Sequence, residues 1–87
     1  MTSLKGLFEL YKIEKDIVTD RALANNLGIS HTALANYRAG TRRLPDIAIV
    51  KLARTTSTDL LTVLALTNLA SPELSDEAKE FWINCLD

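Results

Sequence analysis

The sequence has a single cysteine, Cys85, and can form no internal disulfide bond. A lone thiol also lacks the paired spacing of a zinc site. A nucleophilic role would need a partner histidine, and the only one, His31, is better explained by the motif around it. No run of about 18 apolar residues and no basic start followed by an apolar stretch occur. We therefore expect a cytoplasmic protein in a bacterial cell, neither secreted nor membrane-spanning.

Patterns typical of catalysis are missing as well. The sequence contains no paired carboxylates, no nucleophile beside a base, no metal-ligand cluster and no glycine-rich phosphate loop. We expect no enzymatic activity, no metal, no cofactor and no small-molecule ligand.

Glycine and proline together occupy only five of the 87 positions, whereas 47% of the residues are apolar. Strand signals are absent, because apolar runs such as residues 47–52 fit helical spacing at least as well as alternation. The length suits one small domain without a second core. We predict a compact all-α fold, with five helices in residues 1–70. A further helix in residues 71–87 packs on this domain or on a dimer partner.

The net charge of −1 hides an uneven distribution. Residues 1–54 carry nine Lys or Arg and five Asp or Glu, whereas residues 55–87 carry one and six. Between Ser30 and Pro45 there are three arginines and no acid. Such asymmetry indicates a basic half that binds nucleic acid and an acidic half that faces elsewhere.

Apolar spacing predicts a first helix over about residues 3–15, whose stripe could extend to Ile13. The rest of this stripe consists of Leu4, Leu7, Phe8 and Tyr11. A second helix follows over residues 20–27, capped by Thr19 and with Asp20 at its positive end. Its inner side is predicted to consist of Ala22, Leu23 and Leu27, with the small Ala24 beside them.

Gly28 stands among helix formers in the stretch LANNLGISHTALANYRAG. Glycine costs a helix interior roughly 1 kcal/mol relative to alanine, but it ends a helix well in the left-handed conformation. Ser30 then caps a third helix over about residues 31–39, which ends at Gly40, and Ile29 fills the angle. The prediction is two short helices joined by a three-residue turn, a helix-turn-helix unit. Helical spacing puts Leu34 and Tyr37 on the packed side and His31, Thr32, Ala33, Ala35 and Asn36 on the free side.

A fourth helix is predicted over about residues 46–54, begun by Pro45 or the aspartate after it. Its core residues are predicted to be Ile47, Val50, Leu52 and Ala53. A fifth helix, within residues 59–70 and capped by Ser57 or Thr58, is apolar on nearly every side. Ser71 and Pro72 break this helix. Ser75 then caps a last helix, with Phe81, Trp82, Cys85 and Leu86 on its apolar side.

The stretch TDRALANNLGISHTALANYRAGTRRLP, residues 19–45, resembles the Cro and phage-repressor class of helix-turn-helix regulators. The positions in register are Leu23, Ala24, Leu27, Gly28, Ser30, Leu34, Tyr37 and Gly40. This resemblance covers residues 4–69. The tail SPELSDEAKEFWINCL is similar, over a shorter stretch, to the Phe-Trp-containing C-terminal helix of small regulators found with filamentous phages and prophages.

The resemblance implies that the helix beginning at His31 lies in the DNA major groove. Its base contacts would be an Asn36 amide on adenine, His31 on guanine, and a thymine methyl against Thr32 or Ala33. The implied phosphate contacts, which set affinity rather than sequence, are Ser30, Arg38, Thr41, Arg42 and Arg43. The alternative is that His31, Arg42 and Arg43 are ordinary solvent-exposed residues that contact no DNA. We favour phosphate for Arg42 and Arg43, because the stretch from Ser30 to Pro45 contains no acid.

Asp20 departs from the family pattern. Members often carry glutamine there, and its amide meets a phosphate. A carboxylate would repel phosphate unless it turns back onto the helix terminus, although backbone amides nearby could still bind.

The apolar fifth helix must be covered on more than one side, and two arrangements remain open. The last helix could cover it entirely, with Trp82 closing the core, or the two could form a two-fold interface. We favour the interface, because one short reading helix makes too few contacts for specificity and a second copy on a palindrome supplies more. The predicted interface residues are Leu60, Leu61, Leu64, Leu69, Phe81 and Trp82.

These observations predict a sequence-specific DNA-binding transcriptional regulator, a homodimeric repressor of phage or prophage genes on a palindromic operator of double-stranded DNA. The alternative is an antitoxin-like interaction module. Its acidic C-terminal half would bind a toxin, and its DNA binding would regulate its own operon.

Overall fold

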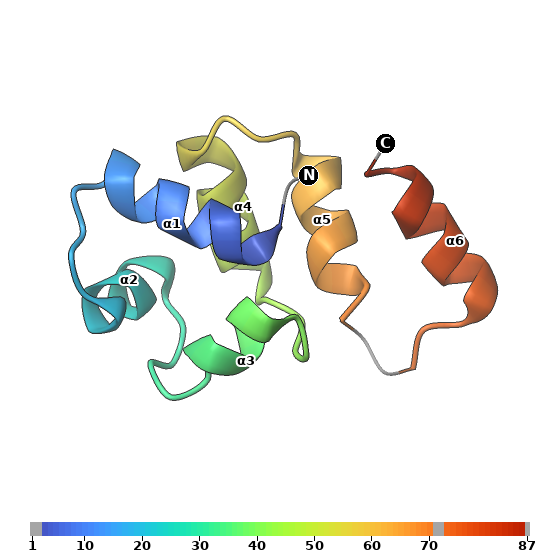
Figure 1. Cartoon of the computed structure of the whole chain (residues 1–87), viewed down its shortest axis with the longest axis horizontal. Coiled ribbons are helices and arrows are strands. Elements are labelled where there is room, and N and C mark those ends of the chain that lie inside the picture. The colour runs from blue at the N-terminus through green and yellow to red at the C-terminus, as the bar shows by residue number, and fades with distance from the viewer. Residues whose placement is uncertain (1–2, 71–72, 87) are drawn as a thin grey trace.

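In the computed structural model, residues 3–70 and 73–86 are described, and these two ranges form six α-helices and no strand (Figure 1). The helices are α1 (Leu4–Glu14), α2 (Asp20–Leu27), α3 (Leu34–Ala39), α4 (Asp46–Thr55), α5 (Leu60–Asn68) and α6 (Asp76–Asn84). The prediction of an all-α fold is confirmed. The helix break expected at Ser71 and Pro72 lies outside the described residues.

Side-chain caps explain where several helices begin. Thr19 and Ser75 each accept a hydrogen bond, at 3.2 Å, from the backbone amide three residues further on, as predicted. The predicted cap of α5 is wrong, because Asp59 replaces Ser57 or Thr58 and accepts from the amide of Leu61 at 2.8 Å. Ser57 has a φ of 54°, so it turns the chain rather than holding the extended backbone that a cap needs.

The core lies between α1, α2, α3, α4 and α5. Its largest fully buried side chains are Tyr11, Phe8, Leu23, Leu27, Leu44, Ile49, Leu52, Val63 and Thr67. Ile13 and Ala22, expected on inner faces, are exposed.

The predicted core face of α4 is partly wrong. Ile47 and Val50 are 55% and 39% exposed, whereas Ala48 and Ile49 are buried beside Leu52 and Ala53. Both sets recur every three to four residues, so helical spacing does not tell them apart.

Helix α6 lies at one end of the molecule and packs chiefly against α5 (Figure 1). None of its described residues is buried, and Phe81 is 58% exposed with its ring edge-on to Trp82. On α5, Leu60 and Leu61 are 46% and 53% exposed. Complete coverage of α5 by α6, one of the two alternatives, is therefore excluded within the protomer.

No helix in the described ranges is long and apolar enough to cross a membrane. The longest, α1, has 11 residues. Within residues 3–70 and 73–86, no three His, Cys, Asp or Glu side chains lie close enough together to hold a metal ion.

Candidate nucleic-acid interface

Helices α2 and α3 are joined by a sharp turn at Gly28. This glycine has φ 74° and ψ 30°, in the left-handed region. Its amide donates to the carbonyl of Asn25 at 3.2 Å, and the amide of Ile29 donates to the carbonyl of Ala24 at 2.9 Å. These bonds satisfy carbonyls at the end of α2. Ile29 packs, partly buried, against the core. The predicted end of α2 at a left-handed Gly28 is confirmed.

The start of α3 differs from the prediction, because the helix begins at Leu34 and not at His31. The amides of Ala33 and Leu34 donate to carbonyls three residues back, at 3.2 and 3.3 Å, which is the spacing of a 3₁₀ turn. The hydroxyls of Ser30 and Thr32 hydrogen-bond each other at 2.8 Å. Ser30 is therefore not the N-cap of α3.

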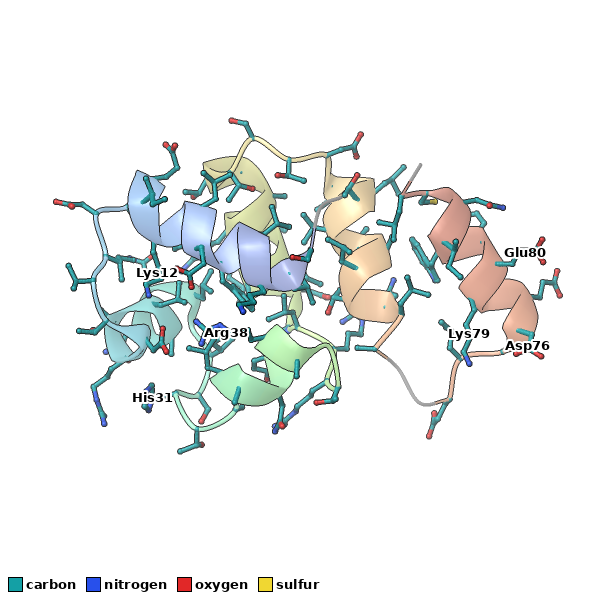
Figure 2. All side chains as sticks on the ribbon, in the orientation of Figure 1. Lys12, His31, Arg38, Asp76, Lys79 and Glu80 are labelled. Atoms are coloured by element: carbon teal, nitrogen blue, oxygen red, sulfur yellow. The ribbon has the colours of Figure 1, made fainter. Side chains whose placement is uncertain are left out.

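The exposed side of this segment is polar and carries no acid. His31, Thr32, Ala35 and Asn36 are exposed, and Figure 2 shows His31 at the turn between α2 and α3, at the edge of the molecule. Ala33 is only 6% exposed, so its predicted place on the free side is wrong. Ala33 precedes Tyr37 by four positions, and residues four apart share one face of a helix, so Ala33 lies on the packed side with Tyr37. We call the exposed set the α3 surface, and it consists of Ser30, His31, Thr32, Ala35, Asn36, Thr41 and Arg42.

The loop after α3 brings Thr41 and Arg42 beside this helix. Gly40 ends α3 with a φ of 76°, and the amide and hydroxyl of Thr41 both donate to the carbonyl of Asn36, at 3.0 and 3.2 Å. The Arg42 guanidinium lies 5.6 Å from the centroid of the Tyr37 ring. Such stacking orients an arginine and leaves its N–H groups available.

Arg38 does not project as a phosphate ligand. Its two terminal nitrogens donate to the carboxylate of Asp20 at 3.0 and 3.2 Å. Lys12 adds a contact to the same carboxylate at 3.4 Å, and Glu9 lies 3.9 Å from Arg38. Figure 2 shows Arg38 between α1 and α3, on the side facing Lys12. Arg38 is therefore engaged within the protein, and its phosphate contact stays a prediction that would require this ion pair to open.

The same ion pair changes the expectation for Asp20. The hydrogen bonds from Arg38 lower the pKa of Asp20 from 3.8 to about 2, and the charge of Arg38 and the Lys12 contact act in the same direction. The carboxylate stays ionised, but its charge is matched by a cation at close range. Asp20 thus turns toward α3 rather than onto its own helix terminus.

Arg43 is also held by its own chain. Its Nε donates to the side chain of Asn68 at 2.7 Å, and one terminal nitrogen donates to the carbonyl of Leu44 at 3.2 Å. The same nitrogen lies 3.4 Å from Asp46. The side chain is therefore drawn toward α5, and Thr41 and Arg42 are better placed than Arg43 to reach outward beside α3.

The charge asymmetry of the sequence is also an asymmetry in space. Asp76, Lys79 and Glu80 lie on α6 at one end of the long axis, and His31 lies near the other end (Figure 2). The described part of the molecule extends 38 Å along this axis. At 0.15 M ionic strength charges are screened over about 8 Å, so the acids of α6 have little effect on His31 at the other end of the molecule.

No protein-family model, no curated protein and no solved structure matches this chain. The resemblance to the Cro and phage-repressor class consequently depends on the sequence pattern of residues 19–45.

Sequence reasoning missed Thr67, which holds the loop of the α3 surface in place. Thr67 is fully buried, and its hydroxyl accepts a hydrogen bond from the amide of Leu44 at 2.6 Å. A signal was present, because Thr67 is one of few polar residues in the apolar stretch DLLTVLALTNLA. A polar side chain inside such a stretch needs a partner once it is buried.

Proposed function

We propose that this protein is a sequence-specific DNA-binding regulator in which α2 and α3 form a helix-turn-helix. One observation carries the proposal: the turn at Gly28 presents an exposed polar surface free of acids at the start of α3, while Leu34 and Tyr37 anchor the opposite side in the core. In a helix-turn-helix, the second helix packs on one side and places the exposed residues at its N-terminus in the DNA major groove.

The α3 surface offers the chemistry needed to read base pairs. The Asn36 amide can form two hydrogen bonds with adenine, and His31 can donate to a guanine acceptor. Thr32 and the exposed Ala35, which replaces the buried Ala33 in this role, can contact a thymine methyl. Each well-formed pair discriminates by about 1–3 kcal/mol.

Backbone phosphates would be bound by the residues around this helix. We assign the main charged contact to Arg42 and polar contacts to Thr41 and Ser30, since Arg38 is held by Asp20 and Arg43 by Asn68. These contacts position α3 without reading sequence.

A dimer supplies the second reading helix. Val50, Leu60 and Leu61 form part of an exposed apolar face of α4 and α5, and Leu64 lines a shallow groove there together with Val50 and Leu60. A dimer formed through this face would bind a palindrome if its two copies of α3 lie about 34 Å apart, which is one helical turn of DNA. The resemblance to phage regulators points to repression by occupancy of a palindromic operator.

The exposed side chains of α6 favour a second candidate function, an antitoxin-like interaction module. Phe81 and Ile83 are 58% and 51% exposed beside Asp76, Glu77 and Glu80. An acidic helix with exposed apolar side chains suits a basic protein partner. A neighbouring reading frame that encodes a small basic protein, and the binding of that protein to α6, would favour this candidate.

The experiment that tests the proposal is a gel shift on the intergenic DNA upstream of the gene. Asn36→Ala should relax sequence preference at one position of each half-site, and Arg42→Ala should weaken binding to all sequences alike. Asn25→Ala and Lys79→Ala are the controls, because they remove an exposed amide and an exposed cation outside the α3 surface. Equal effects of Asn36→Ala and Asn25→Ala would contradict the assignment.

A further inference from the structure

A polar hollow of about 460 Å³ lies where the C-terminal ends of α1, α2 and α4 converge. It is lined by Tyr11, Lys15, Asn26, Lys51, Arg54 and Thr55. Three of these six side chains are cations, and no described Asp or Glu is among them. This concentration of positive charge belongs to a chain whose net charge is −1.

The hollow is separate from the α3 surface. Lys15 is the C-cap of α1, and Arg54 lies in the last turn of α4. Arg54 follows the first residue of α4, Asp46, by eight positions, which corresponds to a rise of about 12 Å along the helix. The hollow therefore lies at the opposite end of α4 from the loop that carries Arg42.

The negative C-terminal ends of the three helices compensate only part of this positive charge. Each helix C-terminus carries roughly −0.5 of an elementary charge, so three of them contribute about −1.5. Lys51 binds the C-terminal end of α2 directly, because its Nζ donates a hydrogen bond to the carbonyl of Asn26 at 2.9 Å. Lys15 and Arg54 form no ion pair with any described residue. A net positive charge therefore remains in the hollow, and an anion would compensate it.

The polar groups of the lining are mainly donors. The buried Tyr11 hydroxyl donates to Oδ1 of Asn26, which orients this amide with its oxygen toward Tyr11 and leaves its NH₂ group to donate. Ammonium, guanidinium and amide donors around one hollow are the groups that recognise phosphate oxygens. The volume lies within the range of about 300–1,000 Å³ that small-molecule sites occupy.

We propose that this hollow binds the phosphate group of a small phosphorylated molecule. Lys15 and Arg54 supply the charged hydrogen bonds, and Lys51 and Asn26 complete the donor set. The proposal is independent of DNA binding, and its test contains no DNA.

The test is a nuclear magnetic resonance titration of the full chain, labelled with ¹⁵N, at ionic strength held constant with chloride. The probes are inorganic phosphate, adenosine monophosphate and adenosine without phosphate. Saturable shifts centred on the amides of Lys15, Asn26, Lys51 and Arg54 are expected with the first two probes and not with adenosine. Tighter binding of the nucleotide than of inorganic phosphate would identify an organic phosphate as the ligand, and equal binding would identify the free anion.

Variants locate the binding. Lys15→Ala with Arg54→Ala should weaken phosphate binding at least about tenfold, because two charge-assisted hydrogen bonds are lost. Arg21→Ala with Lys79→Ala removes the same charge from exposed positions elsewhere and should leave binding unchanged. Arg54→Lys keeps the charge and should retain most of the affinity, which separates binding from folding. Shifts that do not saturate, that spread over basic residues throughout the chain, or that survive the first double substitution would overturn the proposal.

Discussion

Arg38, in the last turn of α3, and Asp20, the first residue of α2, are joined by two hydrogen bonds of 3.0 and 3.2 Å. These residues are 18 positions apart in the sequence. Their ion pair ties the beginning of α2 to the end of α3, so it acts with the turn at Gly28 to hold the angle between the two helices. Lys12 connects the same carboxylate to α1.

The Asp20 ion pair should make stability depend on pH in acid. Because the pKa of Asp20 is about 2 in the folded protein and near 3.8 ordinarily, the pair stabilises the fold above the ordinary value. This stabilisation should be lost as the pH falls through about 2. Asp20 is 41% exposed, so solvent screens the pair, and we expect a loss of about 0.5–1 kcal/mol.

Urea unfolding at a series of pH values checks this prediction. Asp20→Asn should lower the unfolding free energy at neutral pH and flatten its decline in acid. Glu14→Gln, which removes an exposed carboxylate outside the ion pairs of the described residues, is the control and should keep the wild-type slope. An unchanged slope in Asp20→Asn would show that the pair does not contribute.

Gly28→Ala should destabilise the fold by about 1–2 kcal/mol, because a side chain resists the left-handed backbone. The cost is conformational and not steric, since a Cβ at Gly28 would come no closer than 4.0 Å to Ile47. Gly28→Asn should cost less, because asparagine tolerates this region better. Chemical denaturation measures both variants. Asn25→Ala, at an exposed helical position of α2 without positive φ, should not destabilise, and a loss equal to that of Gly28→Ala would contradict the explanation.

The buried bond between Thr67 and Leu44 gives a third prediction. Thr67→Val keeps the shape of the side chain but leaves the amide of Leu44 without its acceptor, which should cost about 1–3 kcal/mol. Thr67→Ser keeps the hydroxyl and should preserve the bond. Hydrogen exchange of the Leu44 amide should therefore accelerate in the valine variant and stay slow in the serine variant. Equal protection in both variants would mean that the bond does not hold this loop.

If the protein is a dimer, a substitution in the proposed interface should halve the mass of the particle in solution. Leu60→Lys places a charge on the exposed apolar face of α4 and α5, so sedimentation at micromolar concentration should show monomer in place of dimer. Ile13→Lys, at a position that is 74% exposed on α1, is the matched control and should sediment as the wild type does. A wild-type protein that sediments only as monomer would remove the dimer from the proposal.

Both ends of α2 and the C-terminal end of α3 could be predicted from the sequence because their signals are local. Thr19, Gly28 and Gly40 act through hydrogen bonds and backbone angles within a few residues of themselves. The core face of α4 could not be predicted in the same way. Ile47 and Ile49 are both apolar and both fit helical spacing, and only the neighbouring helices decide which of them is buried.

The same distinction between local and distant signals applies to the side chains of the candidate site. The exposure of His31 and Asn36 follows from the local pattern around Leu34 and Tyr37. The positions of Arg38 and Arg43 depend on Asp20 and Asn68, which are 18 and 25 residues away. No local rule connects an arginine to a partner at such a distance. The sequence therefore predicts a basic segment but not which arginine remains available.

Salt dependence tests which arginine meets DNA. Each neutralised phosphate contributes about −0.9 to the slope of log affinity against log salt, so a dimer with one Arg42 contact per protomer loses about 1.8 of its slope in Arg42→Ala. Asn36→Ala should leave the slope unchanged, because a base contact displaces no counterion. Arg38→Ala should weaken the ion pair with Asp20 and lower stability but not alter the slope. If Arg38→Ala changed the slope as much as Arg42→Ala, then DNA would draw Arg38 away from Asp20, and the ion pair would be an alternative state of the free protein.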